Sequence, residues 1–455
     1  MPFIDIFSKH DFASMHYVTN TAFNNVSSFD PKKPSLLILH PFLLDSSWLN
    51  NQFEDGRLYQ FYNIIAFDRR SSGKSRCKAS GSHDSWVDAA DLAFCHHALH
   101  LPPCHILALE SVAVNCALRF ALLFPEKCLS LILCNVPSSL EAKWVNAAYH
   151  EILRNWCFAD DLETLEQAQF EVAKFVIGND RDMDLQDELI AYWQMEIPPT
   201  RRHRVLETFN VLLHRDCLED ETLASIKHPV LIVHGEKNDV YPLKHAQQLS
   251  SQLQNAEGGA ILYSVKGGGA GLALVQSSVS ITNQVLAKFL ARQPYVGSVL
   301  RAPEVARDDR MRTALMRLAD IMSDSAITRR DPLSPISFSC LTQDIVQTQT
   351  DLLTQYRSRE NQAFSPLGVD GRPIRRYSAK QHDHWFFGGK GGLSVANTVI
   401  TADRTPIKFD PDREKMSSLR GDYADDKYAR KHSAGEITIT KVTSTSIMSN
   451  TPNIR

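Results

Sequence analysis

Short apolar runs alternate with amphipathic segments between about residues 35 and 292. Most of these runs are continuous stretches of Leu, Ile and Val, which are typical of strands buried on both faces of a parallel sheet. The predicted strands are residues 35–40, 63–68, 104–109, 129–134, 229–235 and 259–265. Helices are predicted between or after them at residues 85–101, 112–124 and 280–290. This order predicts an α/β fold with a doubly wound, mostly parallel sheet.

One long segment, residues 140–226, interrupts the alternation with helix-forming and aromatic residues. It predicts a helical cap insertion, which divides the sheet domain into a first part, residues 1–139, and a second part, residues 227–295. After that domain, two amphipathic helices are predicted at 304–323 and 341–360 inside an extension of residues 296–408. Residues 409–455 are rich in Ser, Thr, Lys and Asp, and this composition predicts a disordered tail.

Composition narrows the classes of partner. The 455 residues carry 49 Lys and Arg against 52 Asp and Glu, so a net charge of -3 gives no global attraction to nucleic acid or anionic membrane. Nine scattered cysteines predict free thiols in a reducing compartment. A basic leader and an apolar run of about 20 residues are both missing, so we expect a cytoplasmic protein without a membrane partner.

Two features that could suggest a cofactor or a metal lack the required context. The glycine-rich runs 267–271 and 388–392 are not placed between a strand and a helix, as a dinucleotide fingerprint requires. The cysteines and histidines of residues 95–105 lack the spacing of zinc ligands. We therefore predict no cofactor and no bound metal.

The segment with the clearest chemical pattern is residues 104–124. A predicted strand ends, Ser111 follows at the turn, and a helix begins at once. Such a turn lifts a hydroxyl above the carboxyl edge of a parallel sheet and brings the free N–H groups of a helix start beside it. Acyl transfer needs both features, an exposed nucleophile and donors for the developing oxyanion. Ser111 is therefore the candidate nucleophile.

Four segments together resemble the α/β-hydrolase superfamily over about residues 30–295. His40-Pro41-Phe42 is similar to the H-G-x loop after the third strand. Residues 68–75, Asp-Arg-Arg-Ser-Ser-Gly-Lys-Ser, are similar to the D-x-R-G-x-G-x-S segment. Residues 109–113, Leu-Glu-Ser-Val-Ala, stand where the G-x-S-x-G elbow belongs, and residues 230–242 match the strand and turn that present the acid. Residues 335–339 and 363–376 are similar to extensions on some fungal proteins of this fold.

The resemblance implies a role for individual residues. Ser111 would be the nucleophile and Asp239 the acid that orients the base. The backbone N–H groups of Phe42 and Val112 would form the oxyanion hole. The cap would enclose an apolar pocket for a small-molecule substrate.

Three residues depart from the pattern of the superfamily. Leu109 replaces the first glycine of the elbow, and Ser71 replaces another glycine, a change that we expect to be tolerated. Leu272 stands where the catalytic histidine is expected. Without a general base a neutral serine hydroxyl is a weak nucleophile. After residue 245 the next histidines are His382 and His384, which are the candidates for a substitute base.

Three functions remain open from the sequence. The first is a serine hydrolase that acts on an ester or thioester of a small apolar metabolite with an unusual base. The second is a catalytically degenerate scaffold that binds a ligand or, through its extension, a partner protein. The third is a non-hydrolytic enzyme, a lyase or isomerase, that uses only the oxyanion hole and the cap pocket. The fold hosts many reactions and does not choose among them.

Overall fold

The computed structural model describes residues 2–140, 143–178 and 182–380. The chain divides into two units, one of residues 1–374 with 440–455 and one of residues 375–439. The description below concerns residues 2–374 of the first unit. The predicted tail, residues 409–455, lies outside the described residues, as do residues 381–408.

A nine-stranded sheet forms the centre of this unit, in the order β1-β2-β4-β3-β6-β7-β8-β9, with β5 paired to β2. Neighbouring strands from β4 to β9 run parallel, whereas β2 is antiparallel to β1, β4 and β5. The strands are β1 Phe3–Phe7, β2 Phe12–Thr19, β3 Ser35–Leu39, β4 Asn63–Phe67, β5 Arg76–Cys77, β6 Cys104–Leu109, β7 Cys128–Cys134, β8 Val230–Gly235 and β9 Ile261–Val265. The six predicted strands are all present, and the doubly wound, mostly parallel sheet is confirmed.

Helices cover both faces of the sheet, which explains the continuous apolar strands. Alternate residues of β3 belong to two separate apolar clusters, Leu37 and Leu39 to one and Leu36 and Ile38 to the other. The first cluster includes side chains of α3, α4 and α10, and the second includes side chains of α11. The helices are α1 Asn50–Phe53, α2 Gly56–Tyr59, α3 Ser85–Ala98, α4 Ser111–Leu123, α5 Lys143–Cys157, α6 Leu162–Ile177, α7 Met183–Glu196, α8 Arg202–Leu213, α9 Asp220–Ala224, α10 Leu243–Gln252, α11 Gln276–Leu290, α12 Arg307–Met322 and α13 Gln343–Arg357.

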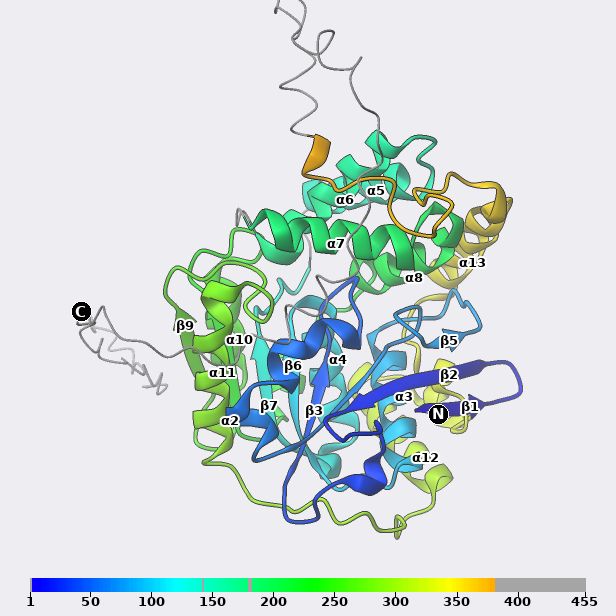
Figure 1. Ribbon diagram of the computed structural model, residues 1–455. Coiled ribbons are helices and arrows are strands. Elements are labelled where there is room, and N and C mark those ends of the chain that lie inside the picture. The colour runs from blue at the N-terminus through cyan, green and yellow to red at the C-terminus, as the bar shows by residue number, and fades with distance from the viewer. Residues whose placement is uncertain (1, 141–142, 179–181, 381–455) are drawn as a thin grey trace, which may run out of the picture. The chain divides into compact units, whose positions relative to one another are not determined.

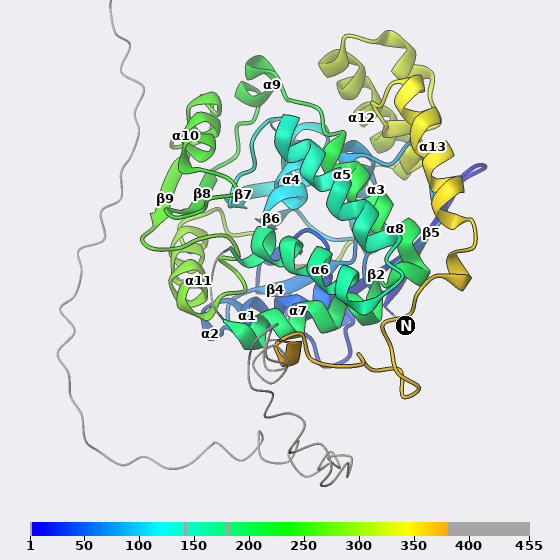
Figure 2. The ribbon, with the colours of Figure 1, turned by 90° about the horizontal axis from the view of Figure 1, so that it is seen from above.

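The predicted insertion forms helices α5 to α8, which we call the cap. They lie together beyond one end of the sheet (Figure 1) and extend across it when seen from above (Figure 2). Two buried tryptophans, Trp156 and Trp193, pack within the cap with ring centres 5.4 Å apart. The indole N–H of Trp193 also donates to the carbonyl of Leu43, 3.0 Å away, and so attaches the cap to the loop after β3.

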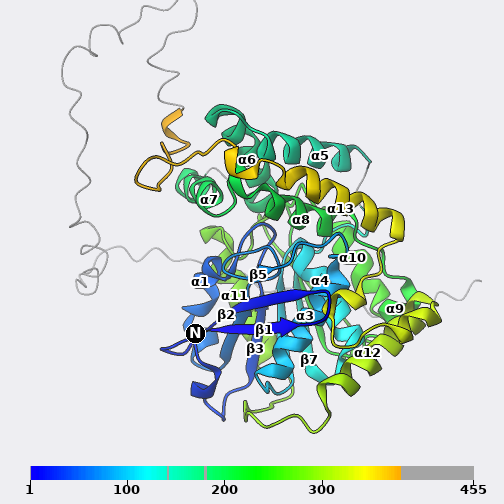
Figure 3. The ribbon, with the colours of Figure 1, turned by 90° about the vertical axis from the view of Figure 1, so that its right-hand side faces the viewer.

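The extension, residues 296–374, contacts both the sheet domain and the cap. Helix α12 packs on α3 and α4, and Met311 and Leu315 are buried there. Helix α13 packs on α8, as Figure 3 shows beside the cap. Arg202 of α8 donates to the backbone carbonyls of Tyr356 and Ser358. The extension therefore connects the cap to the sheet domain.

None of the helices in the described part of the chain is both long and apolar enough to cross a membrane.

Candidate active site

A sharp backbone turn places Ser111 at the carboxyl end of β6. Glu110 follows the strand with φ 69° and ψ 151°, and Ser111 begins α4 with φ 46°. Positive φ is unfavourable for residues other than glycine and costs about 1–3 kcal/mol per residue. Such strain is found mainly at functional sites, where it fixes a side chain in a required position. The strand–turn–helix predicted around Ser111 is therefore present, and it is strained.

The hydroxyl of Ser111 is buried and has no hydrogen-bond partner among the described residues. It lines a cavity of about 20 Å³, together with Phe42 of the β3 loop, Tyr149 and Phe175 of the cap, and Asn238 after β8. One water needs roughly 10–15 Å³ of such space, so the cavity can hold one water and no ester. The cap is closed over Ser111.

The two backbone amides predicted for the oxyanion hole belong to Phe42, in the loop after β3, and to Val112, the residue that follows Ser111. Phe42 is 7% exposed and lines the cavity, and its ring contacts Phe209 of α8 edge-on, with ring centres 5.3 Å apart. Val112 lies in the first turn of α4, where an N–H has no acceptor inside the helix. Arg69 donates to the carbonyl of Pro41 at 3.1 Å and so supports the loop that carries Phe42. The use of these two amides as an oxyanion hole stays a prediction.

The position of the expected histidine is filled by an apolar side chain. Leu272 is fully buried in the apolar cluster that also contains Leu109, so the two departures from the elbow and base motifs pack in the same part of the core. The preceding Gly271 has φ 69°, and a Cβ there would lie 2.9 Å from the carbonyl of Val176 in α6. The cap therefore packs directly on the loop that would carry a base.

No histidine lines the cavity within the described part of the chain. The side chain of His40 is buried, and its Nδ1 donates to the carbonyl of Pro41 while Nε2 accepts from the backbone N–H of Arg69. Burial and the charge of Arg69 lower the pKa of His40 to about 3. His40 is therefore neutral and fully used in structure. His382 and His384, the predicted substitute bases, lie outside the described residues.

Asp239, the predicted acid, is exposed and is not among the residues that line the cavity. The adjacent Asn238 is 4% exposed and does line it. The side chain of Asn238 is held in this turn because its Oδ1 accepts hydrogen bonds from the backbone N–H groups of Val240 and Tyr241, at 3.1 and 2.9 Å. Its Nδ2 is buried and has no hydrogen-bond partner among the described residues, so a second side chain that lines the cavity has an unused polar atom.

Glu110 is a cavity residue that the sequence analysis did not single out. Its Oε1 accepts from Asn135 Nδ2 and from the backbone N–H of Leu272, both at 3.2 Å. Burial raises the pKa of Glu110 to about 7, although Asn135 and the amides of Gly271 and Leu272 partly offset this effect. An acidic residue directly after a fully buried, mostly apolar strand and before a candidate nucleophile was the signal that could have identified it.

Asn135, at the end of β7, holds this arrangement together. Its Nδ2 also approaches the carbonyl of Gly269 at 3.3 Å, and its Oδ1 accepts from the N–H of Gly235 at 3.0 Å. One buried amide therefore connects the carboxyl ends of β7 and β8 with Glu110 and the loop after β9. This network fixes the orientation of the Glu110 carboxyl.

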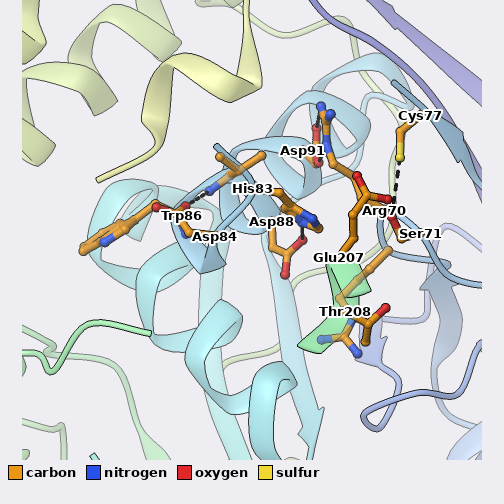
Figure 4. Close-up of polar contacts among 12 residues, drawn as sticks. Arg70, Ser71, Cys77, His83, Asp84, Trp86, Asp88, Asp91, Glu207 and Thr208 are labelled. Carbon is orange, nitrogen blue, oxygen red and sulfur yellow. Dashed lines mark hydrogen bonds and ion pairs between the residues drawn. The ribbon is translucent and has the colours of Figure 1, made fainter. Parts of the chain in front are cut away.

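A second buried polar cluster lies beside α3 and supports the cap (Figure 4). Arg70 forms ion pairs with Asp91 at 2.5 Å and with Asp11 at 2.7 Å. Ser71, expected to replace glycine at little cost, has φ 59° and is strained. Its hydroxyl donates to the carboxylate of Glu207 in α8, and this bond ties the cap to the sheet domain. None of these residues is among the described residues that line the Ser111 cavity.

No group of three or more His, Cys, Asp or Glu side chains in the described residues is arranged to hold a metal ion. His96, in the cysteine- and histidine-rich segment, is buried, and its Nε2 lies 2.8 Å from the carbonyl of Pro102. Cys104 is a free buried cysteine.

No family model and no curated protein matches the chain. Among solved structures, an α/β-hydrolase enzyme from a Medee basin deep-sea metagenome library is similar with a TM-score of 0.50 and 16% identity, over 64% of this chain and 98% of its own. The chain has the α/β-hydrolase fold. A bromoperoxidase from Bacillus anthracis is similar with a TM-score of 0.51 and 15% identity, over 64% of this chain and 99% of its own.

A hydrolase from Pseudomonas aeruginosa PA01 is similar to the same extent, with a TM-score of 0.50 and 18% identity over 63% of this chain and 98% of its own. At identities this low, the structural similarity shows only that this protein has the α/β-hydrolase fold. Its reaction has to be argued from the residues of its own site.

Proposed function

We propose that the protein is a serine hydrolase that cleaves an ester or thioester of a small apolar metabolite. The observation that carries this proposal is the buried, unpartnered hydroxyl of Ser111 on a strained turn. Both the strain and the unpaired hydroxyl reduce the stability of the folded chain, and the hydroxyl makes no hydrogen bond in return among the described residues. Features that weaken a fold without a structural return are expected where catalysis needs them.

In this proposal Glu110 takes the role of the missing imidazole. A carboxyl with a pKa of about 7 is half ionised near neutral pH, which suits a general base. As Ser111 Oγ forms a bond to the substrate carbonyl carbon, its proton passes through the water for which the cavity has room to the Glu110 carboxylate. The carbonyl oxygen becomes negative and is stabilised by the amides of Phe42 and Val112.

The tetrahedral intermediate then loses its alkoxide or thiolate, which takes the proton from Glu110. Water attacks the resulting acyl-serine and gives one proton to Glu110. The second tetrahedral intermediate then expels the Ser111 alkoxide, which takes this proton from Glu110, so the acid is released and Ser111 and the Glu110 carboxylate are regenerated. The rings of Tyr149 and Phe175 line the cavity and favour an apolar acyl group. Because the closed cavity measures about 20 Å³, the cap has to move before substrate enters.

A fluorophosphonate probe and a small thioester test the proposal together. We expect the probe to label the wild-type chain and to fail on Ser111→Ala, while Ser277→Ala, an exposed serine on α11, is labelled normally. The rate of turnover should rise as pH increases through about 7. Glu110→Gln should abolish this pH dependence and lower the rate at least about tenfold. Labelling that persists in Ser111→Ala would contradict the proposal.

A second candidate is a ligand-binding scaffold without turnover. The full burial of Leu272 at the position of the expected base favours this candidate, because the loop after β9 carries no histidine that a movement could bring to Ser111. This candidate predicts that a folded wild-type chain shows neither labelling nor turnover. Turnover that survives Ser111→Ala would instead support the non-hydrolytic lyase or isomerase.

A further inference from the structure

A groove of about 700 Å³ lies at the amino ends of the central strands. It is lined by residues at the start of three strands, Pro34 before β3, Tyr62 before β4 and His105 in β6, and by the last turns of α11. Its volume falls within the range of about 300–1,000 Å³ that is typical of small-molecule sites. His105 and Ser111 are at opposite ends of β6, about 20 Å apart at 3.3 Å per residue. The groove is therefore separate from the Ser111 cavity.

Two buried polar side chains line the groove and have hydrogen-bonding atoms to spare. His105 is 1% exposed and its Nδ1 lies 2.9 Å from Ser130 Oγ, while its Nε2 has no partner among the described residues. Tyr62 is 6% exposed, and its hydroxyl likewise has no partner in the described part of the chain. Burial lowers the pKa of His105 to about 4 and raises the pKa of Tyr62. Both groups are therefore neutral near pH 7 and can bond to a ligand atom.

The remaining polar lining consists of cationic and neutral side chains, namely Lys32, Lys33, Lys288 and Arg57 and the glutamines Gln60, Gln284 and Gln293. Lys32, Lys33 and Lys288 have no carboxylate partner within the described chain, and no Asp or Glu lines the groove. Arg57 also lines it but is paired with Asp55 at 2.5 Å. Lys33 Nζ donates to the backbone carbonyl of Tyr59 at 3.2 Å. Three ammonium groups without a carboxylate partner among the described residues, in a chain whose net charge is -3, create a local positive field, which attracts anions.

The groove also has an apolar part. Phe61 is 62% exposed and Tyr295 is 70% exposed, and both rings line the groove beside Leu290. Large exposed rings gathered in one place mark a binding surface more often than scattered ones do. A ligand that fits this groove needs an apolar body for the rings and an anionic group for the lysines.

We propose that the groove binds an amphiphilic organic anion, an apolar chain or ring that ends in a carboxylate or phosphate. The apolar body lies against Phe61, Leu290 and Tyr295, and the anionic group is held by the lysines. The proposal does not depend on hydrolase activity at Ser111, because no residue of that cavity takes part.

Fluorescence titration of the full chain with 8-anilinonaphthalene-1-sulfonate tests the site, since this probe is itself an aromatic anion. We expect saturable binding that weakens as salt is raised, because salt screens the lysines. Decanoate and decyl phosphate should displace the probe, and comparison of the two identifies the preferred anionic group. Decanol, with the same chain and no charge, should be at least about tenfold weaker, which is about 1.4 kcal/mol.

Variants locate the binding. Lys32→Glu/Lys288→Glu should weaken the probe at least about tenfold, whereas Lys9→Glu/Lys266→Glu, the same charge change on exposed residues outside the groove, should stay within about twofold. Ala291→Trp, which fills the groove without changing charge, should also weaken binding, and Ser111→Ala should not. The proposal is overturned if both groove variants bind like the wild type, if decanol competes as well as decanoate, or if only anionic vesicles are bound.

Discussion

Replacing Glu110 by glutamine is expected to stabilise the protein above pH 7 and to do little near pH 5. The substitution keeps an oxygen that can accept from Asn135 and from the N–H of Leu272. It removes the ionisation that burial opposes. The pKa of Glu110 rises from its ordinary value of 4.5 to about 7 in the folded chain. At about 1.4 kcal/mol per pH unit, this difference corresponds to about 3 kcal/mol.

The sign follows from proton binding in the two states. Between pH 4.5 and about 7 the unfolded chain has released the proton of Glu110 and the folded chain still holds it. The free energy of unfolding therefore falls as pH rises through this window, and the full loss is present above pH 7. Glutamine does not titrate, so Glu110→Gln avoids the loss at high pH and gains almost nothing at low pH.

Urea unfolding at about pH 5 and pH 8, followed by fluorescence, measures the effect as a change in midpoint. We expect a higher midpoint for Glu110→Gln at pH 8 and nearly equal midpoints at pH 5. Glu54→Gln, an exposed glutamate, is the matched control and should leave both midpoints unchanged. A gain of the same size at both pH values, or a loss at pH 8, would refute the argument that burial holds the proton on Glu110.

Three further substitutions test the structural argument by thermal or chemical unfolding. Ser111→Gly should raise stability by about 1–2 kcal/mol, because glycine accepts φ 46° without strain; an unchanged midpoint would show that the turn is not strained. Arg202→Ala should cost about 2–3 kcal/mol and speed hydrogen exchange in α13, since it removes two charge-assisted bonds; unchanged exchange would contradict this contact. Arg70→Met should cost about 3–5 kcal/mol, because it leaves two buried carboxylates without their partner; a neutral effect would show that they are protonated.

The inner strands could be predicted because burial on both faces requires a continuous apolar run, which can be seen in the sequence. A strand such as β3, buried on both faces, is apolar at nearly every position, and its run of four Leu and Ile residues after Ser35 is visible without any tertiary information. Strands β1 and β2 were missed. β1 alternates exposed and buried residues over five positions, Phe3–Phe7, so it carries a weaker apolar signal at the antiparallel edge of the sheet.

The active-site residues divide in the same way. Ser111 was found because its strand, turn and helix are adjacent in sequence. The absence of the base at Leu272 was visible for the same reason. Asn238 was missed in favour of Asp239, because a hydrogen bond from the turn decides which side chain faces inward. Glu110 was missed because its role depends on Asn135 and on the loop after β9, which only the folded sheet brings together.

The contacts of the extension determine how a substrate can be admitted. Helix α13 is bonded to α8 through Arg202, and the same extension is anchored on α3 where Asp84 accepts from the N–H of Cys340 at 2.8 Å. A cap that was attached only through its connecting loops could move as a rigid body. Here the cap is also bonded to α13, so the cap cannot move away from the sheet until α13 detaches or moves with α8. Any opening of the cap thus involves a helix none of whose described residues lines the Ser111 cavity.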